Sequence, residues 1–276
     1  MPVTIIHSDT LSAEQHQHIS QALGNTPQVC GAHFRVEHAP ISEDALQALR
    51  ASCALDINTL PEGFNPQEVR LLISDMDSTL ISIECVDEIA DFMGVKPEVA
   101  AITEAAMRGE LDFAASLQNR VSLLTGLDVS ALQRVYDERL TLNPGAELLM
   151  SGLKQQHIKC ALVSGGFSYF TDRLKSRLNL DFTLANVLAE ADNKLLGRVD
   201  GAIVDAEVKA TYLQQLCEKL EISPQQVIAM GDGANDLKML GVAGLGVAYH
   251  AKPAVSAQAD VAIQYRGLDA VLDFLV

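Results

Sequence analysis

Two carboxylates that stand two residues apart give the sequence its clearest chemical signal. Asp75 and Asp77 directly follow an apolar run at residues 69–74, within the pentapeptide Asp-Met-Asp-Ser-Thr. Where a chain leaves a strand in an extended conformation, two such side chains can face the same side, which suits a nucleophile beside a proton donor. A carboxylate attacks phosphorus well but is a poor base, so the second carboxylate would handle the protons. A turn or a helix cap is the alternative interpretation, because Asp and Ser are also common there.

A second acidic motif predicts a site for a hard cation. Asp232 and Asp236 lie in the hexapeptide Gly-Asp-Gly-Ala-Asn-Asp, directly after an apolar run at residues 227–230. The two glycines allow a sharp turn close to a ligand, and no His or Cys accompanies the carboxylates. An all-oxygen cluster selects a hard cation, and beside a phosphate this favours Mg²⁺. Asp caps at a helix N-terminus are the competing explanation.

Two weaker signals could bind the oxygens of a phosphate. Ser164, Gly165 and Gly166 follow another apolar run, and they offer a hydroxyl and exposed amides before the next predicted helix. Lys209 stands at the start of a predicted helix and could supply positive charge. Taken alone, each signal fits an ordinary turn or a surface lysine equally well.

The first quarter of the chain has the pattern of a small α+β unit. A segment rich in Pro, Gly and Asn, residues 60–67, is the predicted linker that ends this unit. Within residues 1–66, strand-like runs at 3–6 and 29–36 alternate with helical stretches at 12–23 and 42–51.

The remainder predicts a doubly wound parallel sheet with a helical insertion. Strand-like and helical runs alternate through residues 67–83 and 142–276, which is typical of a parallel sheet with helices on both faces. Residues 84–141 have a helical pattern with Gly and Pro punctuation, and they form the insertion. Ligands of such sheets bind beyond the carboxyl ends of the strands. The motifs follow predicted strands, so we expect them to form one site.

Composition and charge restrict the partners and the compartment. The 276 residues are 48% hydrophobic, and 36 acidic against 20 basic residues give a net charge of -16, which disfavours nucleic acids and anionic membranes as partners. Five cysteines without a CxxC pair indicate thiols in a reducing compartment. Neither a signal peptide nor an apolar run of membrane-spanning length is visible, so we expect a cytoplasmic protein. The seven scattered histidines, including His16 and His18, read as solvated helix residues, not as a zinc site.

The order of the motifs carries a resemblance to a known superfamily. Four segments resemble, in order, the four signature motifs of the haloacid dehalogenase superfamily: Asp-Met-Asp-Ser-Thr, Ser-Gly-Gly, Lys209 and Gly-Asp-Gly-Ala-Asn-Asp. Within it, Glu84 and the helical stretch at residues 107–124 resemble the phosphoserine phosphatase family. The resemblance extends from about residue 69 to the carboxyl terminus. Asp77 stands where dehalogenases lack an aspartate, so dehalogenase activity is disfavoured.

The resemblance implies a role for each motif residue. Asp75 would accept the phosphoryl group, and Asp77 would act as the general acid and base. Mg²⁺ would be held by Asp75, by the main-chain carbonyl of Asp77 and by Asp232, with Asp236 close behind. The phosphoryl oxygens would be bound by Ser164, the Gly165 amide and Lys209, with Asn235 beside them.

Three residues of the insertion would select the substrate in this family. Phe113 and Arg120 are seven positions apart, two helical turns, so they share one helix face that could close over the strand ends. Arg can hold a carboxylate with two parallel hydrogen bonds, and Glu84 can pair with an ammonium group. Together they complement a zwitterionic amino acid. A core Phe, a surface Arg and a Glu that stabilises a helix start are the alternative interpretations.

We therefore expect hydrolysis of the small molecule L-phosphoserine to serine and phosphate through an aspartyl-phosphate intermediate, which is the last step of serine biosynthesis in this family. A related phosphatase or phosphotransferase acting on another small phosphomonoester, such as phosphothreonine, is an alternative. Residues 1–66 partly resemble small βα modules that sense amino acids, so an amino-acid-binding regulatory protein is a third interpretation. The same unit could instead serve homodimerisation.

Overall fold

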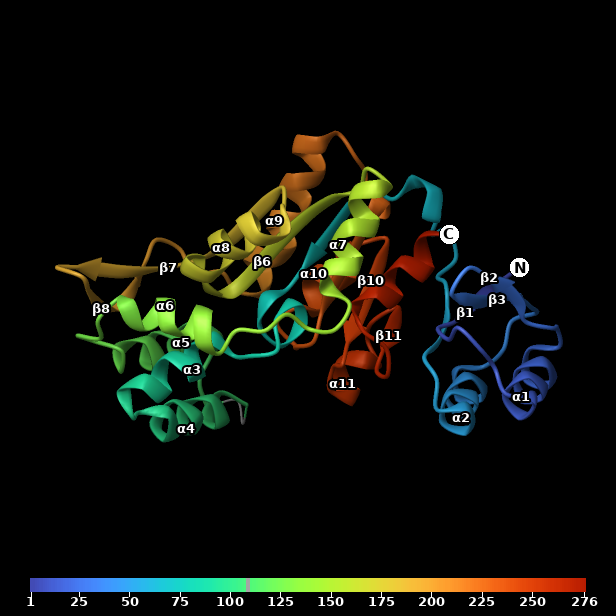
Figure 1. The fold of residues 1–276 in the computed structure, drawn as a ribbon, viewed down its shortest axis with the longest axis horizontal. Coiled ribbons are helices and arrows are strands. Elements are labelled where there is room, and N and C mark those ends of the chain that lie inside the picture. Colours follow the sequence, from blue (N-terminus) through green and yellow to red (C-terminus); the bar gives the residue numbers. More distant parts are fainter. Residues whose placement is uncertain (108–109) are drawn as a thin grey trace.

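The structure, a computed structural model, describes residues 1–107 and 110–276. Arg108 and Gly109, which belong to the stretch that resembles the phosphatase family, lie outside the described residues. The amino-terminal sheet and the helical insertion lie at opposite ends of the molecule, with a large central sheet between them (Figure 1).

The amino-terminal unit is a four-stranded sheet that packs against two helices. The sheet has the order β2-β3-β1-β4, and β1 pairs antiparallel with both β3 and β4. Ile6, Ile19 and Leu49 belong to an apolar cluster that the strands and helices share. The elements are β1 (Val3–Ile6), α1 (Ala13–Leu23), β2 (Gln28–Cys30), β3 (His33–Glu37), α2 (Glu43–Cys53) and β4 (Ile57–Thr59).

Two features of this unit differ from the sequence-based prediction. The predicted single strand at residues 29–36 is a hairpin, because Gly31 adopts a φ of 63° and reverses the chain between β2 and β3. Strand β4 was not predicted, since its three residues are too few to show a periodic pattern.

Polar side chains join the amino-terminal unit to the central sheet. The Asn58 side chain donates to the carbonyl of Ala262 at 2.9 Å and accepts from the amide of the same residue at 3.0 Å, as a neighbouring strand would. The carboxylate of Asp56 accepts the amides of three consecutive residues, Gln264, Tyr265 and Arg266, at 2.7 to 3.0 Å. The edge strand of the core is thereby capped by side chains.

Buried histidines line the same junction. His7 and His33 are 0% and 2% exposed, and their Nδ1 atoms lie 2.8 and 3.2 Å from the carboxylate oxygens of Asp273. His38 is buried within the amino-terminal unit itself, where it hydrogen-bonds Thr4 at 2.7 Å. The interpretation of the histidines as solvated helix residues is therefore wrong for these three, which lie on or beside strands.

The central sheet has seven strands in the order β11-β10-β9-β5-β6-β7-β8. All neighbouring pairs are parallel except β7 and β8, which form an antiparallel hairpin at one edge. This topology confirms the predicted α/β class. The elements are β5 (Leu71–Ser74), α7 (Ala146–Gln155), β6 (Lys159–Phe167), α8 (Ser168–Leu178), β7 (Phe182–Ala191), β8 (Lys194–Asp200), α9 (Ala206–Leu220), β9 (Val227–Gly231), α10 (Leu237–Val242), β10 (Leu245–Tyr249), α11 (Pro253–Ser256) and β11 (Val261–Ile263), followed by a 3₁₀ helix at Leu268–Leu275 and with further 3₁₀ turns at Pro66–Glu68 and Pro224–Gln226.

Helices cover both faces of this sheet because successive strand residues point to opposite sides. Along β5, Leu71 and Ile73 join an apolar cluster with residues of α9 and α10, such as Leu213. Leu72 faces the other way and joins a cluster with residues of α7, α8 and the terminal 3₁₀ helix, such as Leu149 and Phe274. The strands that carry the acidic motifs are therefore fully enclosed.

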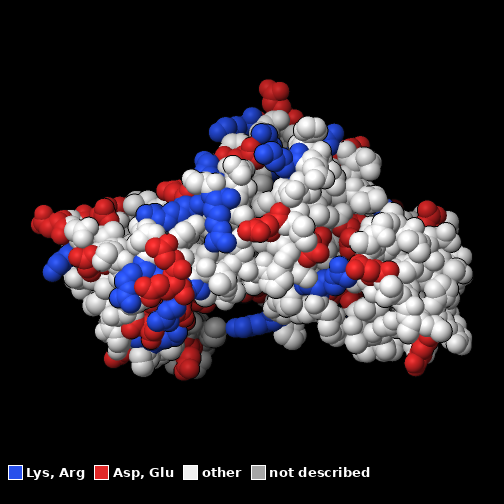
Figure 2. All heavy atoms as spheres, in the orientation of Figure 1, with Lys and Arg blue, Asp and Glu red and all other residues white. Residues whose placement is uncertain are grey.

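The helical insertion comprises α3 (Cys85–Met93), α4 (Lys96–Met107), α5 (Phe113–Ser122) and α6 (Ser130–Glu138). Side chains of both charges gather over it in Figure 2, whereas the amino-terminal unit shows few charges on that face. Within the insertion and its end, Arg139 bonds Glu88 at 2.7 Å and Asp91 at 3.0 Å. No helix of the described residues is both long and apolar enough to cross a membrane.

Candidate active site

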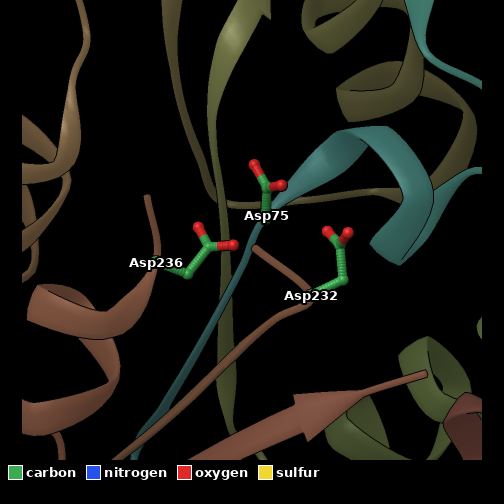
Figure 3. A group of neighbouring side chains, drawn as sticks. All are labelled: Asp75, Asp232 and Asp236. Atoms are coloured by element: carbon green, nitrogen blue, oxygen red, sulfur yellow. The ribbon is translucent and has the colours of Figure 1, made fainter. Parts of the chain in front are cut away.

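Three carboxylates from distant parts of the chain meet at the carboxyl edge of the central sheet. Asp75 follows β5, Asp232 follows β9, and Asp236 stands at the start of α10. One oxygen of each lies within 4.8 Å of the others, and Figure 3 shows the side chains converging. Because β5 and β9 are neighbouring parallel strands, their carboxyl ends lie side by side. The fold thus brings the two acidic motifs together.

Lys209, in the first turn of α9, is the cation of this cluster. It is 1% exposed, and its Nζ lies 2.6 Å from Asp75 Oδ1 and 2.7 Å from Asp236 Oδ1. Burial alone would lower the pKa of the ammonium, but the two carboxylates outweigh burial and raise this pKa. Burial and then the charge of Asp236 raise the pKa of Asp75 well above its usual range, while Lys209 opposes them. A fixed positive charge therefore lies beside Asp75.

Asp77 projects from the turn that follows β5. Its Oδ1 accepts the amide of Cys85 at 3.1 Å, and a methyl group on Gly166 would lie 2.6 Å from its Oδ2. Burial, followed by the charge of Glu84, raises the pKa of Asp77 to about 7, against the hydrogen bond from Cys85. A carboxyl group with this pKa can both give and take a proton near neutral pH, as a general acid and base must.

The oxygen cluster fits a hard divalent cation. Burial and then the charge of Asp236 raise the pKa of Asp232 to about 6, and a bound cation would offset both effects on this carboxylate. Thr79 donates to Asp232 Oδ1 at 3.0 Å and fixes the orientation of that carboxylate. Asp236 already uses one oxygen for the buried ammonium and the other for the Gly233 amide at 3.1 Å. Asp75 and Asp232 are therefore better placed than Asp236 to bind a cation directly.

A glycine turn at the end of β6 presents a hydroxyl and main-chain amides to the same edge. The Oγ of Ser164 accepts the Gly166 amide at 2.8 Å, so the hydroxyl proton can be donated to a ligand. Buried Asn186 of β7 donates to the Gly165 carbonyl at 2.8 Å and accepts the Val204 amide at 2.9 Å. The sequence analysis missed Asn186, because no local pattern marks it.

Phe113 begins helix α5 of the insertion and reaches the glycine turn. Asp112 caps this helix by accepting the Ala115 amide at 2.7 Å, which fixes where the helix starts. A methyl group on Gly165 would lie 2.8 Å from Cζ of Phe113. The ring therefore covers the turn, and a side chain at residue 165 would displace it.

Glu84 and Arg120 lie near the carboxyl group of Asp77. Ser78, next to Asp77, donates to Glu84 at 2.6 Å. Burial lowers the pKa of the Arg120 guanidinium, while the nearby charges of Asp87, Glu84 and Asp77 oppose this shift. The structure thus brings the three predicted substrate-selecting residues to the edge of the sheet where the carboxylates lie.

The remaining predicted contacts concern groups at the margin of the cluster. Asn235 lies in the loop between β9 and α10, where its Oδ1 would be 2.2 Å from a methyl group on Gly233. The contact of Asn235 with phosphate and the part of the Asp77 carbonyl in metal binding stay predictions.

Known proteins match most of the chain. The family model for haloacid dehalogenase-like hydrolases matches residues 69–244. The phosphoserine phosphatase of Polaromonas sp. is 52% identical over 235 residues, which cover 83% of this chain and 100% of that protein.

Solved structures match the fold as well. A crystal structure of a HAD-family hydrolase from Salmonella enterica serovar Typhi has a TM-score of 0.91 at 32% identity and covers 100% of this chain and 99% of its own. A structure described as a phospho-aspartyl intermediate analogue of phosphoserine phosphatase has a TM-score of 0.71 at 38% identity and covers 75% of this chain and 99% of its own.

Proposed function

The chain belongs to the haloacid dehalogenase-like hydrolase family, and from this membership we propose that it is a phosphoserine phosphatase, which hydrolyses O-phospho-L-serine to L-serine and phosphate. The observation that carries the proposal is the meeting of Asp75, Asp77 and Lys209 at one edge of the sheet, beside an insertion that carries Glu84 and Arg120. The names of the similar phosphatases support the choice of substrate.

In the first step, a carboxylate oxygen of Asp75 attacks phosphorus, and the bond from phosphorus to the serine oxygen breaks. Asp77, in its protonated form, gives its proton to that departing oxygen. Lys209, the Ser164 hydroxyl and the Gly165 amide face the three phosphoryl oxygens and stabilise their negative charge. Serine leaves, and the phosphoryl group stays on Asp75 as an acyl phosphate.

In the second step, Asp77, now a carboxylate, takes a proton from a water molecule that attacks the same phosphorus. The bond from phosphorus to the Asp75 oxygen breaks, and inorganic phosphate forms. Asp77 ends the cycle protonated, as it began. A pKa of about 7 suits both directions of proton transfer, which is the reason for placing this carboxyl in the role.

We propose that Asp75, Asp232 and the main-chain carbonyl of Asp77 hold Mg²⁺, with Asp236 supporting them through Lys209 and the Gly233 amide. When bound, the ion supplies positive charge against the phosphoryl oxygens. The all-oxygen donor set supports a hard cation over zinc.

The amino-acid end of the substrate would lie between Arg120 and Glu84. The guanidinium pairs with the substrate carboxylate, and Glu84, held by Ser78 at 2.6 Å, pairs with the ammonium group. The Phe113 ring closes over the glycine turn beside them.

Arg120→Ala tests this recognition. A hydrogen bond to a charged group contributes about 1.5–3 kcal/mol, so kcat/KM for phosphoserine should fall by roughly 10- to 150-fold. Phosphoethanolamine lacks the carboxylate, so its kcat/KM should change little. Arg134→Ala is the matched control, because Arg134 lies on the same insertion in an exposed pair with Glu138. Equal losses on both substrates would remove the argument for a carboxylate contact.

A phosphatase or phosphotransferase that acts on a chemically similar substrate, such as phosphothreonine, would use the same carboxylates. A panel of phosphorylated amino acids separates these activities, and release of phosphate from phosphothreonine alone would replace the proposed substrate. The panel includes glycerol as an acceptor, because net transfer of the phosphoryl group to this alcohol in place of water would identify a phosphotransferase.

We further propose that the chain divides into an accessory unit at residues 1–66, a catalytic core at 67–83 and 142–276, and a helical cap at 84–141. The exposed edge strand β2 and the separate apolar cluster of the first unit support a role in regulation or homodimerisation. The five free cysteines support a cytoplasmic location. Sedimentation of the full chain with and without serine tests the role of the accessory unit.

A further inference from the structure

The turn after β5 has an irregular backbone. Residues Met76–Leu80 form a wide turn in which the amide of Ile81 donates to the carbonyl of Met76 at 3.0 Å. Ser78 adopts a φ of 56°, which is uncommon for a residue with a side chain. Carbonyl groups in such a turn do not all find partners along the backbone, so something outside the turn must satisfy them.

One side chain from elsewhere in the sequence supplies these partners. The side-chain nitrogen of Asn143 lies 2.7 Å from the carbonyl oxygen of Thr79, 3.2 Å from that of Ile81 and 3.3 Å from that of Ser78. Its main-chain amide donates to the carbonyl of Leu80 at 3.0 Å. Four consecutive carbonyls therefore converge on Asn143. Because all of its side-chain partners are acceptors, the group facing the turn must be the NH₂ end.

This turn holds groups that the proposed chemistry uses. Asp77 lies inside it, Thr79 orients Asp232, and Ser78 bonds Glu84. Asn143 lies on the segment that returns from the helical insertion to α7, and an isolated bridge between Ile81 and Leu142 joins this segment to the outgoing one. A shift of the turn would move the acid–base carboxyl relative to Asp75, which is anchored separately to Lys209.

We propose that Asn143 is a positioning residue for general acid catalysis, holding the turn so that Asp77 reaches the oxygen of the departing alcohol. The inference rests on the proposed function in assigning Asp77 as the proton donor. Loss of the Asn143 donors leaves Asp75 and Lys209 in place but frees the turn that carries the acid. Misplacement of a catalytic group by even a small distance is costly when its geometry is set by the protein.

The leaving group reveals such an effect. A serine alkoxide needs a proton as it departs, whereas the nitrophenolate of p-nitrophenyl phosphate is stable without one. General acid catalysis contributes roughly 10²- to 10⁴-fold, so kcat/KM of Asn143→Ala should fall about 10- to 100-fold for phosphoserine, and by a similar factor for ethyl phosphate, an alkyl ester without the ammonium group that Glu84 would contact. At saturating Mg²⁺, which offsets any loosening of the metal-binding groups in this turn, it should change less than about threefold for p-nitrophenyl phosphate, since that ester does not need the acid.

Asn143→Asp distinguishes a donor from a space-filling side chain. Aspartate has nearly the same shape but turns carboxylate oxygens toward the carbonyls, so the order of activity on phosphoserine should be Asn, then Ala, then Asp. A role in packing alone predicts that Asp behaves like Asn, and that result would overturn the proposal. Equal losses on the alkyl and the aryl ester, or an unchanged Ala variant, would overturn it as well.

Ser82→Ala is the matched control. Ser82 and Thr141 lie on the same two segments and bond each other at 2.6 Å without reaching the turn, so this variant should keep both activities. Circular dichroism and thermal unfolding check that each variant folds. Should Asn143→Ala fail to fold, Asn143→Ser, which retains one donor, takes its place. The same selective loss on the alkyl esters is expected for it, and unchanged activity would contradict the proposal.

Failure of the substrate assignment would look different. If the wild-type protein hydrolyses another alkyl phosphate but not phosphoserine, the proposed function is wrong. The comparison between that alkyl ester and the aryl ester still tests Asn143.

Discussion

Replacing Lys209 by Met removes the cation from a buried cluster and should affect stability and catalysis separately. Lys209 is 1% exposed, Asp75 5% and Asp236 0%, so both carboxylates would stay in a largely dry environment. Removing one partner of a buried ion pair costs about 3–5 kcal/mol, because the remaining charge is left uncompensated. We expect a loss of this size in the free energy of unfolding, measured by urea denaturation in EDTA at pH 7.5.

The stability lost in Lys209→Met should depend on pH in a defined direction. Without Lys209 the pKa of the Asp75 carboxyl rises further, because the ammonium no longer opposes burial and the charge of Asp236. Groups whose pKa is raised on folding contribute stability at low pH that is lost as the pH increases through the raised values. The deficit of Lys209→Met should therefore be largest at alkaline pH and shrink at acidic pH.

Two controls sharpen the experiment. Lys209→Met/Asp236→Asn replaces one carboxylate by a neutral amide and should recover a large part of the lost stability, while phosphatase activity remains lost. Lys238→Met removes an exposed ion pair with Glu207 and should leave the free energy of unfolding nearly unchanged. A Lys209→Met protein as stable as the wild type at every pH would refute the account of the cluster, as would a double variant with no recovery.

Other consequences concern metal binding and the junction of the amino-terminal unit. Burial and the charge of Asp236 raise the pKa of Asp232 to about 6, so protons should compete with Mg²⁺ below that pH. Calorimetry should show weaker Mg²⁺ binding at pH 5 than at pH 7.5, with proton release, and equal affinity at both would contradict this. Thr79→Val should weaken Mg²⁺ binding about 10-fold by freeing Asp232, and unchanged affinity would exclude that role. Asp273→Asn removes the charge shared by His7 and His33 and should loosen the contact between the amino-terminal unit and the core. Protease should then cut the linker at residues 60–67 faster than in the wild type, and an unchanged rate would argue against a role of Asp273 in this contact.

Much of the site was predictable because strand ends can be recognised in the sequence. The apolar runs before Asp75 and Asp232 are β5 and β9, and both are buried on two faces, which explains their unbroken hydrophobicity. Once two such strands are parallel neighbours, the residues after them must meet. The helical insertion was also recognisable, because its hydrophobic periodicity differs from that of the strands on either side.

The supporting residues could not be predicted in this way, because their partners are far away in the sequence. Asn143 contacts a turn that lies more than sixty residues earlier, with separations of 62 to 65 positions. Thr79 belongs to a recognised motif, yet its partner Asp232 is 153 positions away. Asn186 stands in a strand without any distinguishing neighbour. Such contacts depend on the tertiary arrangement, which periodicity and composition do not encode.

The amino-terminal unit shows the same limit on a smaller scale. The turn at Gly31 splits one predicted strand into two, and the three residues of β4 are too short for a pattern. The burial of His7 follows from its contact with Asp273, which is 266 positions away. A polar residue next to a strand end can therefore be buried by a distant segment, which the local sequence does not reveal.

Chemical trapping of the phosphoenzyme tests the central claim, that Asp75 carries the phosphoryl group. The protein is mixed with phosphoserine, quenched in acid and treated with borohydride, which reduces an aspartyl phosphate to homoserine, and the modified peptide is located by mass spectrometry. The account predicts a modification at Asp75 that disappears in Asp75→Asn. Turnover of phosphoserine with the modification on a residue other than Asp75 would contradict the account. Turnover of phosphoserine by Asp75→Asn would contradict it as well.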